Sequence, residues 1–455
     1  MDWRTLITSK RLGQETQHTE RHDDRSEFKR DYDRLIFSAP FRRLQNKTQV
    51  FPLPGSVFVH NRLTHSLEVA SVGMSLGCDI ARDVIRRNPD LAGTQVEELG
   101  TIVSTACLAH YLGNPPFGHS GEKAIQTFFS EGEGKILKDK LSPEIWKDLT
   151  HFEGNANAFR ILTHRYSGRR SGGFVMTYSM LASIVKYPYS SSCCDDETLL
   201  NDKRAKKDKF GFFATEAETY RKIATELGID ITVSPTGGIC GMRHPLVYLV
   251  EAADDICYEI MDIEDAHKLK LISYEETKEL LLGFFDEKTQ KSILDRIETE
   301  SITDQNEQVV YMRACVIGKL ENECVEAFLK NEDAIMAGTF RGSLIKHINE
   351  RQREAYERCS DIAFHRIYRS KPVLDIELGG YKIMETLLKQ MVDATLNPDR
   401  FYSKQLLRRV SSQYEIEAPD LETRILAVVD FISGMTDVFA LDFYQKINGS
   451  SLPIV

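Results

Sequence analysis

The sequence predicts an all-α protein with at most a small β-hairpin. Apolar residues recur at three- and four-residue spacing through most of the chain, and strand-like segments are few and short. The strand signals are confined to residues 173–176 and 230–233. With 455 residues, 42% of them hydrophobic, the chain can build a large core and exceeds the usual size of one domain.

The predicted helices follow one another along the chain. Helical periodicity marks residues 63–84, 96–108, 245–263, 277–285, 309–328, 342–357, 381–392 and 421–444. Ser273 and Glu276 have capping-box spacing ahead of one helix, and Gly338 can end another. Two polar stretches interrupt the pattern. Residues 190–209 are predicted to be an exposed loop or insertion, and the first 25 residues an arm.

Composition and charge exclude several classes of protein. A net charge of −10 argues against a general nucleic-acid coat, although it leaves room for an anionic small substrate. No run approaches the roughly 20 apolar residues of a membrane span, and the N-terminus has no apolar signal segment. Nine scattered cysteines, an odd number, fit reduced thiols. We therefore expect a cytoplasmic protein without a membrane partner.

Three ionisable residues fall on the apolar faces of three different predicted helices: His65, His110 and Asp254. Such side chains are costly to bury unless they are paired or bind a metal. A single histidine in this position is usually a hydrogen-bonded core residue, but two histidines and an aspartate favour a shared metal site. Imidazole and carboxylate together suit Mn, Fe, Zn or Ni better than Ca.

The helix that contains Asp254 has a polar stripe. Tyr258 and Asp262 follow at i+4 and i+8, so the three residues line one helix face. A metal ligand, a phenol and a second acid in a row could bind one ligand along its length. The alternative is an ordinary amphipathic helix with a polar edge.

The segment after His110 has a more specific pattern. Gly113 can end the preceding helix, and Pro115-Pro116 imposes an extended turn. His119 and Glu122 then stand three residues apart, on one face if a helix begins there. A carboxylate that orients a histidine is an acid/base arrangement. A capping-type turn with incidental histidine and glutamate is the alternative.

Short segments spread over nearly the whole chain match one known pattern. They read RSEFKRDYDR at 25–34, FRRLQNKTQVF at 41–51, HNRLTHSLEV at 60–69, AHYLGNPPFGHSGE at 109–122, FEGNA at 152–156, KYP at 186–188, EAADDI at 251–256 and DFISGMTD at 430–437. With these segments in this order, the chain resembles the deoxyguanosine triphosphate triphosphohydrolase family, the dNTPase branch of the HD superfamily.

The resemblance implies an HD-domain helical bundle with an additional helical C-terminal half. The expected division is 1–54 for an N-terminal arm and first helix, 55–270 for the HD phosphohydrolase domain, and 271–455 for a helical region packed on it. The implied activity cleaves a dNTP, foremost dGTP, between the 5′ oxygen and the α-phosphorus, which releases deoxynucleoside and tripolyphosphate. We also expect a homo-oligomer, and we leave open a nucleic-acid effector.

The resemblance also implies roles for individual residues. Metal ligation falls to His65, His110 and Asp254, with the metal left open among Mn, Mg, Fe, Ni and Zn. Asp254 is preferred over Asp255 because it lies on the buried stripe. The remaining roles are acid/base or nucleophilic chemistry for His119 oriented by Glu122, phosphate binding for Arg62 and Lys186, deoxyribose contact for Tyr258 and Asp262, and sugar or base contact for Gln49.

Tyr111 departs from the family pattern, which has a metal-binding aspartate at this position. A neutral tyrosine is a poor ligand at pH 7, although three protein ligands suffice in some catalytic sites. Three explanations follow: an inactivating substitution, a natural non-catalytic homologue that senses nucleotides or binds single strands, or a compensated site. Because His119, Glu122, Arg62 and Asp254 are retained, the first is preferred, and we expect impaired activity. A nucleotidase of another specificity is a further alternative.

Overall fold

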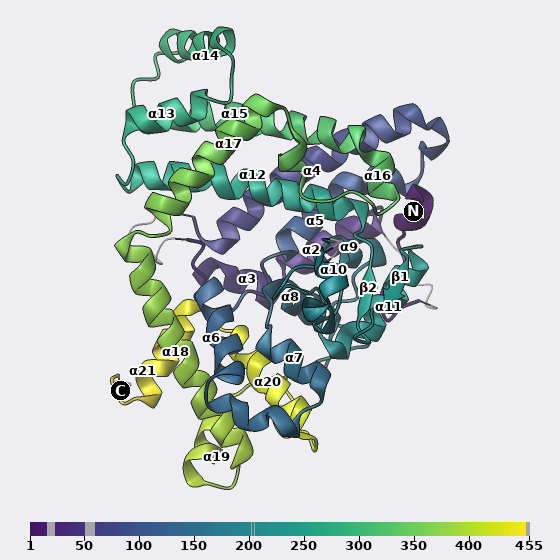
Figure 1. Ribbon diagram of the computed structural model, residues 1–455, viewed down its shortest axis with the longest axis vertical. Helices are drawn as coiled ribbons and strands as arrows, with labels where there is room; N and C mark the ends of the chain where they lie inside the picture. The colour runs from purple at the N-terminus through teal and green to yellow at the C-terminus, as the bar shows by residue number, and fades with distance from the viewer. Residues whose placement is uncertain (16–22, 51–59, 202, 204, 452–455) are drawn as a thin grey trace.

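The computed structural model describes residues 1–15, 23–50, 60–201, 203 and 205–451, and helices dominate it (Figure 1). Within these residues the only sheet has two antiparallel strands, β1 (Ile231–Val233) and β2 (Ile239–Gly241), with Ile231 opposite Gly241. The prediction of an all-α protein with a small hairpin is confirmed. In the described part of the chain, no helix combines the length and apolarity that crossing a membrane requires.

The helices follow one another through the whole described chain. They are α1 (Trp3–Leu6), α2 (Glu27–Ile36), α3 (Ala39–Arg43), α4 (Arg62–Arg87), α5 (Leu99–Ala109), α6 (His119–Ser130), α7 (Pro143–Thr150), α8 (Gly154–Thr163), α9 (Tyr178–Ser183), α10 (Glu197–Asn201), α11 (Ala217–Glu226), α12 (Pro245–Lys268), α13 (Tyr274–Leu282), α14 (Glu287–Thr299), α15 (Gln305–Lys330), α16 (Glu332–Met336), α17 (Glu350–Ile362), α18 (Lys371–Leu396), α19 (Phe401–Leu407), α20 (Leu421–Ser433) and α21 (Asp437–Ile447). Short 3-10 helices η1 (Leu44–Asn46), η2 (Pro89–Leu91), η3 (Gln95–Glu98), η4 (Glu133–Lys140), η5 (Ser191–Asp195), η6 (Ala214–Glu216) and η7 (Leu344–His347) and a π-helix, η8 (Ala363–Ile367), connect them.

Most of the predicted helices are present, and two are divided. The periodic segments 63–84, 96–108, 245–263, 277–285, 309–328 and 381–392 correspond to α4, α5, α12, α13, α15 and α18. The segment 421–444 forms α20 and α21, because the chain turns and Thr436 caps a new helix by accepting from the Phe439 amide at 3.1 Å. The segment 342–357 forms η7 and then α17, because Ile348 and Asn349 are extended.

The strand predicted at residues 173–176 is wrong. Gly173 and Val175 have φ angles of 60° and 57°, which no strand accommodates. The Phe174 amide donates instead to the Leu162 carbonyl at 2.9 Å, so the segment is a turn held against α8.

Two segments predicted to be an exposed loop and an N-terminal arm contain buried side chains. In residues 190–209 the side chains of Cys193, Cys194 and Leu199 lie in the core, so this segment is only partly exposed. In the predicted N-terminal arm, Trp3 and the Arg11 guanidinium are also buried. Residues 16–22 of that arm lie outside the described residues. The polar composition of both segments concealed a few apolar and ion-paired residues that are buried.

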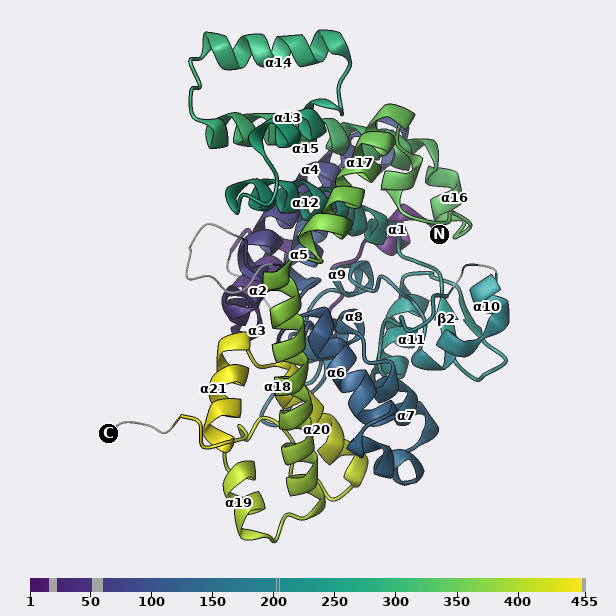
Figure 2. The same cartoon turned by 60° about the vertical axis from the view of Figure 1, so that its left-hand side comes forward.

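Apolar side chains form two clusters. One lies around α4, α5, α12 and α15, and the other around α6, α7, α18 and α20 (Figures 1 and 2). The second cluster combines residues 124–156 with residues 383–443, which are far apart in sequence. The domain division at about residue 270 stays a prediction.

The C-terminal region also fixes the segment that follows His110. The Asp437 carboxylate accepts from the Phe117 amide at 3.0 Å and from the Thr48 amide at 2.8 Å. Arg160 on α8 pairs with Asp430 on α20 through two hydrogen bonds of 2.9 Å. The end of the chain therefore helps to hold the loop between α5 and α6.

Candidate active site

Three packed helices bring His65, His110 and Asp254 together. His65 lies in the first turn of α4, His110 directly follows α5, and Asp254 lies in α12. Helices α4 and α5 pack closely because Gly77 has no side chain; a Cβ there would lie 2.7 Å from the Gly100 Cα. One ligand atom from each of the three residues lies within 4.8 Å of the others. The structure thus brings the three predicted ligands into one cluster.

One carboxylate oxygen is the centre of this cluster. His65 Nε2 and His110 Nε2 both lie 3.2 Å from Asp254 Oδ1. Burial raises the pKa of Asp254, but the two histidines lower it well below its usual range, so the group is ionised. Burial lowers the pKa of His65, which favours the neutral ring.

The contacts of His110 fit a divalent metal. Its Nδ1 donates to the Cys107 carbonyl, so in the neutral ring Nε2 carries a lone pair. This lone pair faces the Asp254 carboxylate, and two acceptors at 3.2 Å need a cation or a proton between them. A backbone carbonyl that orients a metal-binding histidine is a common arrangement. The donor set of two imidazoles and one carboxylate suits Mn, Fe, Zn or Ni, and metal binding stays a prediction.

Tyr111 lies against the same carboxylate. Its hydroxyl donates to Asp254 Oδ1 at 3.1 Å, and its ring centroid lies 3.9 Å from that of His110. Burial raises the pKa of the phenol well above its usual value, and Asp254 raises it further, so the hydroxyl stays protonated. Tyr111 is therefore a hydrogen-bond donor to a predicted metal ligand.

Arg62 is a buried cation that forms no salt bridge with the described residues. Its Cζ lies 4.7 Å from the centroid of the Tyr111 ring, and its Nε is buried without a hydrogen-bond partner in the described residues. Gly118 makes room for it, since a Cβ at Gly118 would lie 2.6 Å from Arg62 Nη2. A guanidinium in this state can bind an anion such as a phosphate.

His119 and Glu122 form the predicted pair at the start of α6. His119 Nδ1 lies 3.2 Å from Glu122 Oε2, and Glu122 Oε1 accepts from the Gly154 amide at 2.9 Å. The hydrogen bond to Glu122 raises the pKa of His119 despite the opposing effect of burial. The His119 side chain is 74% exposed while Glu122 is buried. The carboxylate can thus orient the ring and leave Nε2 free.

Tyr258 and Asp262 continue from the cluster along α12. The rings of His65 and Tyr258 lie 6.4 Å apart, and Asp262 Oδ2 accepts from the Tyr368 hydroxyl at 2.7 Å. Burial raises the pKa of Asp262 well above its usual value. Sequence reasoning missed Tyr368, because it lies 106 positions from Asp262 and no local pattern connects the two.

A cavity of about 160 Å³ adjoins the cluster. Four residues with predicted roles line it. The lining does not include the other six, which are Arg62, His65, His119, Gln49, Tyr258 and Asp262. The lining residues are His110, Tyr111, Asn114, Glu122, Glu153, Asn155, Ser183, Ile184, Lys186, Lys209, Val247, Val250, Glu251 and Asp254. Gln49 lies nearby, with Nε2 3.5 Å from the Tyr111 hydroxyl.

Sequence reasoning missed Lys209 and Glu153 in this cavity. Lys209 Nζ lies 2.5 Å from Glu153 Oε2, and both side chains reach the cavity. Glu153 belongs to the FEGNA segment at residues 152–156, which matches the family pattern, so the sequence contained a signal for it. Lys209 ends the segment expected to be an exposed loop, so no signal marked it.

Comparisons with known proteins indicate the family of this chain. A family model described as "Phosphohydrolase-associated domain" matches residues 346–446. A Pseudomonas aeruginosa protein is 37% identical over 458 residues, and a Synechocystis protein is 35% identical over 459 residues. These matches cover 100% and 99% of this chain and the whole of each relative, and both relatives are named "Deoxyguanosinetriphosphate triphosphohydrolase-like protein". A Yersinia enterocolitica protein named "Deoxyguanosinetriphosphate triphosphohydrolase" is 27% identical and covers 92% of this chain and 93% of its own. The chain belongs to the deoxyguanosinetriphosphate triphosphohydrolase-like family.

Proposed function

We propose that the chain is a metal-dependent dNTP triphosphohydrolase, foremost for dGTP, whose turnover Tyr111 impairs. The observation that carries the proposal is the cluster of His65, His110 and Asp254 near Arg62, whose Nε has no hydrogen-bond partner in the described residues. The names of the relatives supply the substrate class and the triphosphohydrolase reaction. The products are a deoxynucleoside and tripolyphosphate.

In this proposal the metal cluster and the cations around it bind different parts of the triphosphate. A divalent metal held by His65, His110 and Asp254 would polarise the α-phosphate and offset negative charge as the 5′ oxygen leaves. Arg62 binds a phosphate oxygen through its free guanidinium edge. Lys186, which lines the cavity beside Asp254, provides a second cation for the phosphate chain.

His119 moves the proton in this proposal. Its Nδ1 is bonded to Glu122, so Nε2 can deliver a proton to the 5′ oxygen as the bond to the α-phosphorus breaks. A water oxygen forms the new bond to phosphorus, and a proton from that water restores the imidazolium. Glu122 keeps the ring oriented and stabilises its positive charge.

Residues along α12 bind the sugar. Tyr258 lies one turn after Asp254, where its ring leaves no room for a 2′-hydroxyl. Asp262 accepts a hydrogen bond from the Tyr368 hydroxyl in the structure and can accept another from the 3′-hydroxyl of a deoxynucleotide. Gln49 Oε1 is buried without a partner in the described residues, so it can accept from the sugar or the base.

A second candidate function is nucleotide binding without turnover. The observation that favours it is the hydrogen bond from Tyr111 to Asp254 Oδ1, the oxygen that both histidines contact. A homologue of this kind would bind dNTP or single-stranded DNA and hydrolyse neither, even with aspartate at position 111.

Product analysis of the full chain and of Tyr111→Asp tests the proposal. Each protein is incubated with each dNTP and Mn²⁺ or Mg²⁺, and the products are separated by anion-exchange chromatography. We expect deoxynucleoside and tripolyphosphate, with dGTP the best substrate. Orthophosphate as the product contradicts the triphosphohydrolase reaction and supports a nucleotidase. Bound dNTP without products from either protein supports the non-catalytic function.

A further inference from the structure

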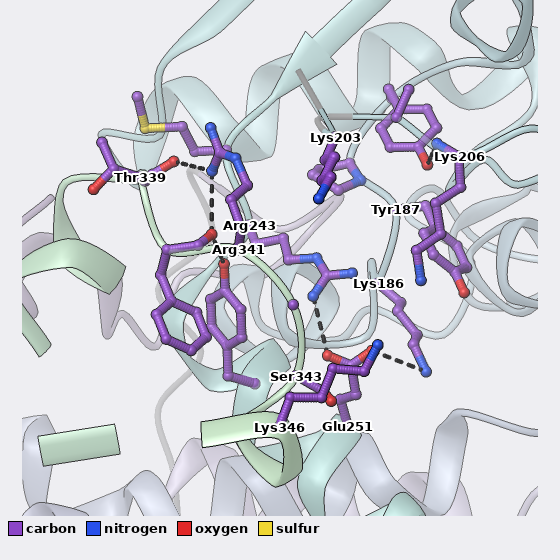
Figure 3. Close-up of a pocket in the computed structure, with 18 of the residues that line it drawn as sticks. Lys186, Tyr187, Lys203, Lys206, Arg243, Glu251, Thr339, Arg341, Ser343 and Lys346 are labelled. Carbon is purple, nitrogen blue, oxygen red and sulfur yellow. Dashed lines mark hydrogen bonds and ion pairs between the residues drawn. The ribbon is translucent and has the colours of Figure 1, made fainter. Parts of the chain in front are cut away.

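A large cavity adjoins the candidate active site. It has a volume of about 890 Å³ and lies between residues 186–189, the β1–β2 hairpin and the loop that follows α16 (Figure 3). Lys186 and Glu251 line both this cavity and the smaller one that contains His110 and Asp254. The two cavities therefore have a wall in common, which this ion pair forms with an N–O distance of 3.3 Å.

The lining of this large cavity is rich in cations. Its charged lining residues are Lys186, Lys203, Lys206, Arg243, Arg341, Lys346 and Arg353 against Asp230, Glu251, Asp255 and Glu357. The Glu251 carboxylate already forms two salt bridges, with Lys186 at 3.3 Å and with Arg243 at 3.0 Å. Figure 3 shows Lys203, Lys206 and Lys346 around the same open space as this pair.

Lys206 and Lys346 are two of the lining cations that form no salt bridge within the described residues. No salt bridge joins either ammonium group to a carboxylate of the described residues, and the Lys206 ammonium lies 5.7 Å from the centroid of the Tyr187 ring. Partial burial lowers the pKa of Lys206; Glu251 opposes this, but the neighbouring cations Arg243, Lys186 and Lys346 lower the pKa further. Cations that repel one another around a cavity gain from a multivalent anion between them.

We infer that this cavity is a second polyphosphate site, which receives the tripolyphosphate that the proposed reaction releases. The choice of tripolyphosphate rests on the proposed function, since no other product of that reaction is a multivalent anion. Tripolyphosphate is a flexible chain that can contact Lys186 from either cavity. It can therefore leave the reaction site while it stays bound to at least one cation. Ammonium groups on long side chains suit such an anion, because they follow its oxygens.

Isothermal titration of the full chain with inorganic tripolyphosphate, without metal and with chelator, tests this inference. The test variant combines Lys206→Ala and Lys346→Ala, and the control combines Lys288→Ala and Lys291→Ala on α14, where both lysines are exposed. We expect the test variant to bind about tenfold more weakly or worse, which corresponds to one or two lost charge-assisted contacts. The control should bind like the unchanged protein.

Conservative variants and a second ligand separate the outcomes. Lys206→Arg with Lys346→Arg keeps both charges and should retain the affinity, even if the alanine variant fails to fold. Titration with dGTP identifies the source of the phosphate chain, because a site that also recognises the nucleoside would bind dGTP more tightly than inorganic tripolyphosphate. The inference is overturned if the unchanged protein does not bind tripolyphosphate, if control and test variants lose equal affinity, or if only dGTP binding depends on these lysines. The titration involves no turnover, so it can fail or succeed independently of the hydrolysis assay.

Discussion

Replacing Tyr111 with aspartate should raise the rate of dGTP hydrolysis by at least about 100-fold. In the structure the Tyr111 hydroxyl donates to Asp254 Oδ1 at 3.1 Å, and its pKa is raised, so it offers no negative ligand atom. Aspartate removes the ring beside His110 and supplies a second carboxylate to the predicted metal site. The variant should therefore hold the metal in the geometry that polarises the α-phosphate.

The magnitude follows from the strength of metal catalysis. A catalytic metal lowers the barrier by several kcal/mol, and each ~1.4 kcal/mol is tenfold in rate. A 100-fold gain needs only about 2.7 kcal/mol of that effect. The same change removes the contact between Arg62 and the Tyr111 ring, worth about 1 kcal/mol, and a hydrogen bond of similar worth. The metal-free variant should thus unfold more easily than the unchanged protein.

The assay measures initial rates of deoxyguanosine release at saturating Mn²⁺, with kcat and KM determined separately. Tyr111→Phe is the matched control, because it removes the hydroxyl and keeps the ring but adds no ligand. We expect no gain from phenylalanine. The reasoning is refuted if the unchanged protein hydrolyses dGTP as fast as Tyr111→Asp, or if Tyr111→Phe gains as much.

Three further predictions concern other parts of the site and the fold. Adding His119→Ala to Tyr111→Asp should abolish the gain in kcat, because the ring and the metal act on the same step; retained activity would assign the proton to another group. In the same active background, Tyr258→Ala should raise the ratio of GTP to dGTP hydrolysis, and an unchanged ratio would place the discrimination elsewhere. Burial lowers the pKa of His60, but Asp265 at 2.9 Å and the nearby Glu68 raise it to about 10. Protonated His60 therefore stabilises the fold fully below pH 6.5, and this stabilisation is lost as pH rises through 10. From pH 7 to 10 the free energy of unfolding of the unchanged protein should fall by on the order of 3 kcal/mol more than that of His60→Gln. Parallel curves for the two proteins from thermal or urea unfolding would contradict this.

Local patterns were sufficient to predict most of the helices and the grouping of the candidate ligands. Helix α4 has a clear apolar stripe, and His65 lies on that stripe, so its burial followed from periodicity. The pairing of His119 with Glu122 followed from their spacing once α6 began at His119. Both are short-range properties of the chain.

Long-range contacts were not accessible from the sequence in the same way. The hydrogen bond from Tyr368 to Asp262 and the salt bridge between Lys209 and Glu153 join segments that only the tertiary fold brings together. The same reason explains why residues 190–209 were expected to be exposed. Cys193 and Cys194 are isolated small apolar residues in a polar stretch, and only their packing against other elements reveals them as core.

Metal content is the most direct test of the central claim that Tyr111 replaces the fourth ligand of a metal site built from His65, His110 and Asp254. The unchanged protein and Tyr111→Asp are loaded with Mn²⁺, passed over a weak chelating resin and analysed for metal per chain by mass spectrometry, with His110→Ala as the control. We predict substoichiometric metal in the unchanged protein, close to one ion per chain in Tyr111→Asp, and little in either background once His110 is removed. Equal and full occupancy in the unchanged protein and in Tyr111→Asp would contradict the claim.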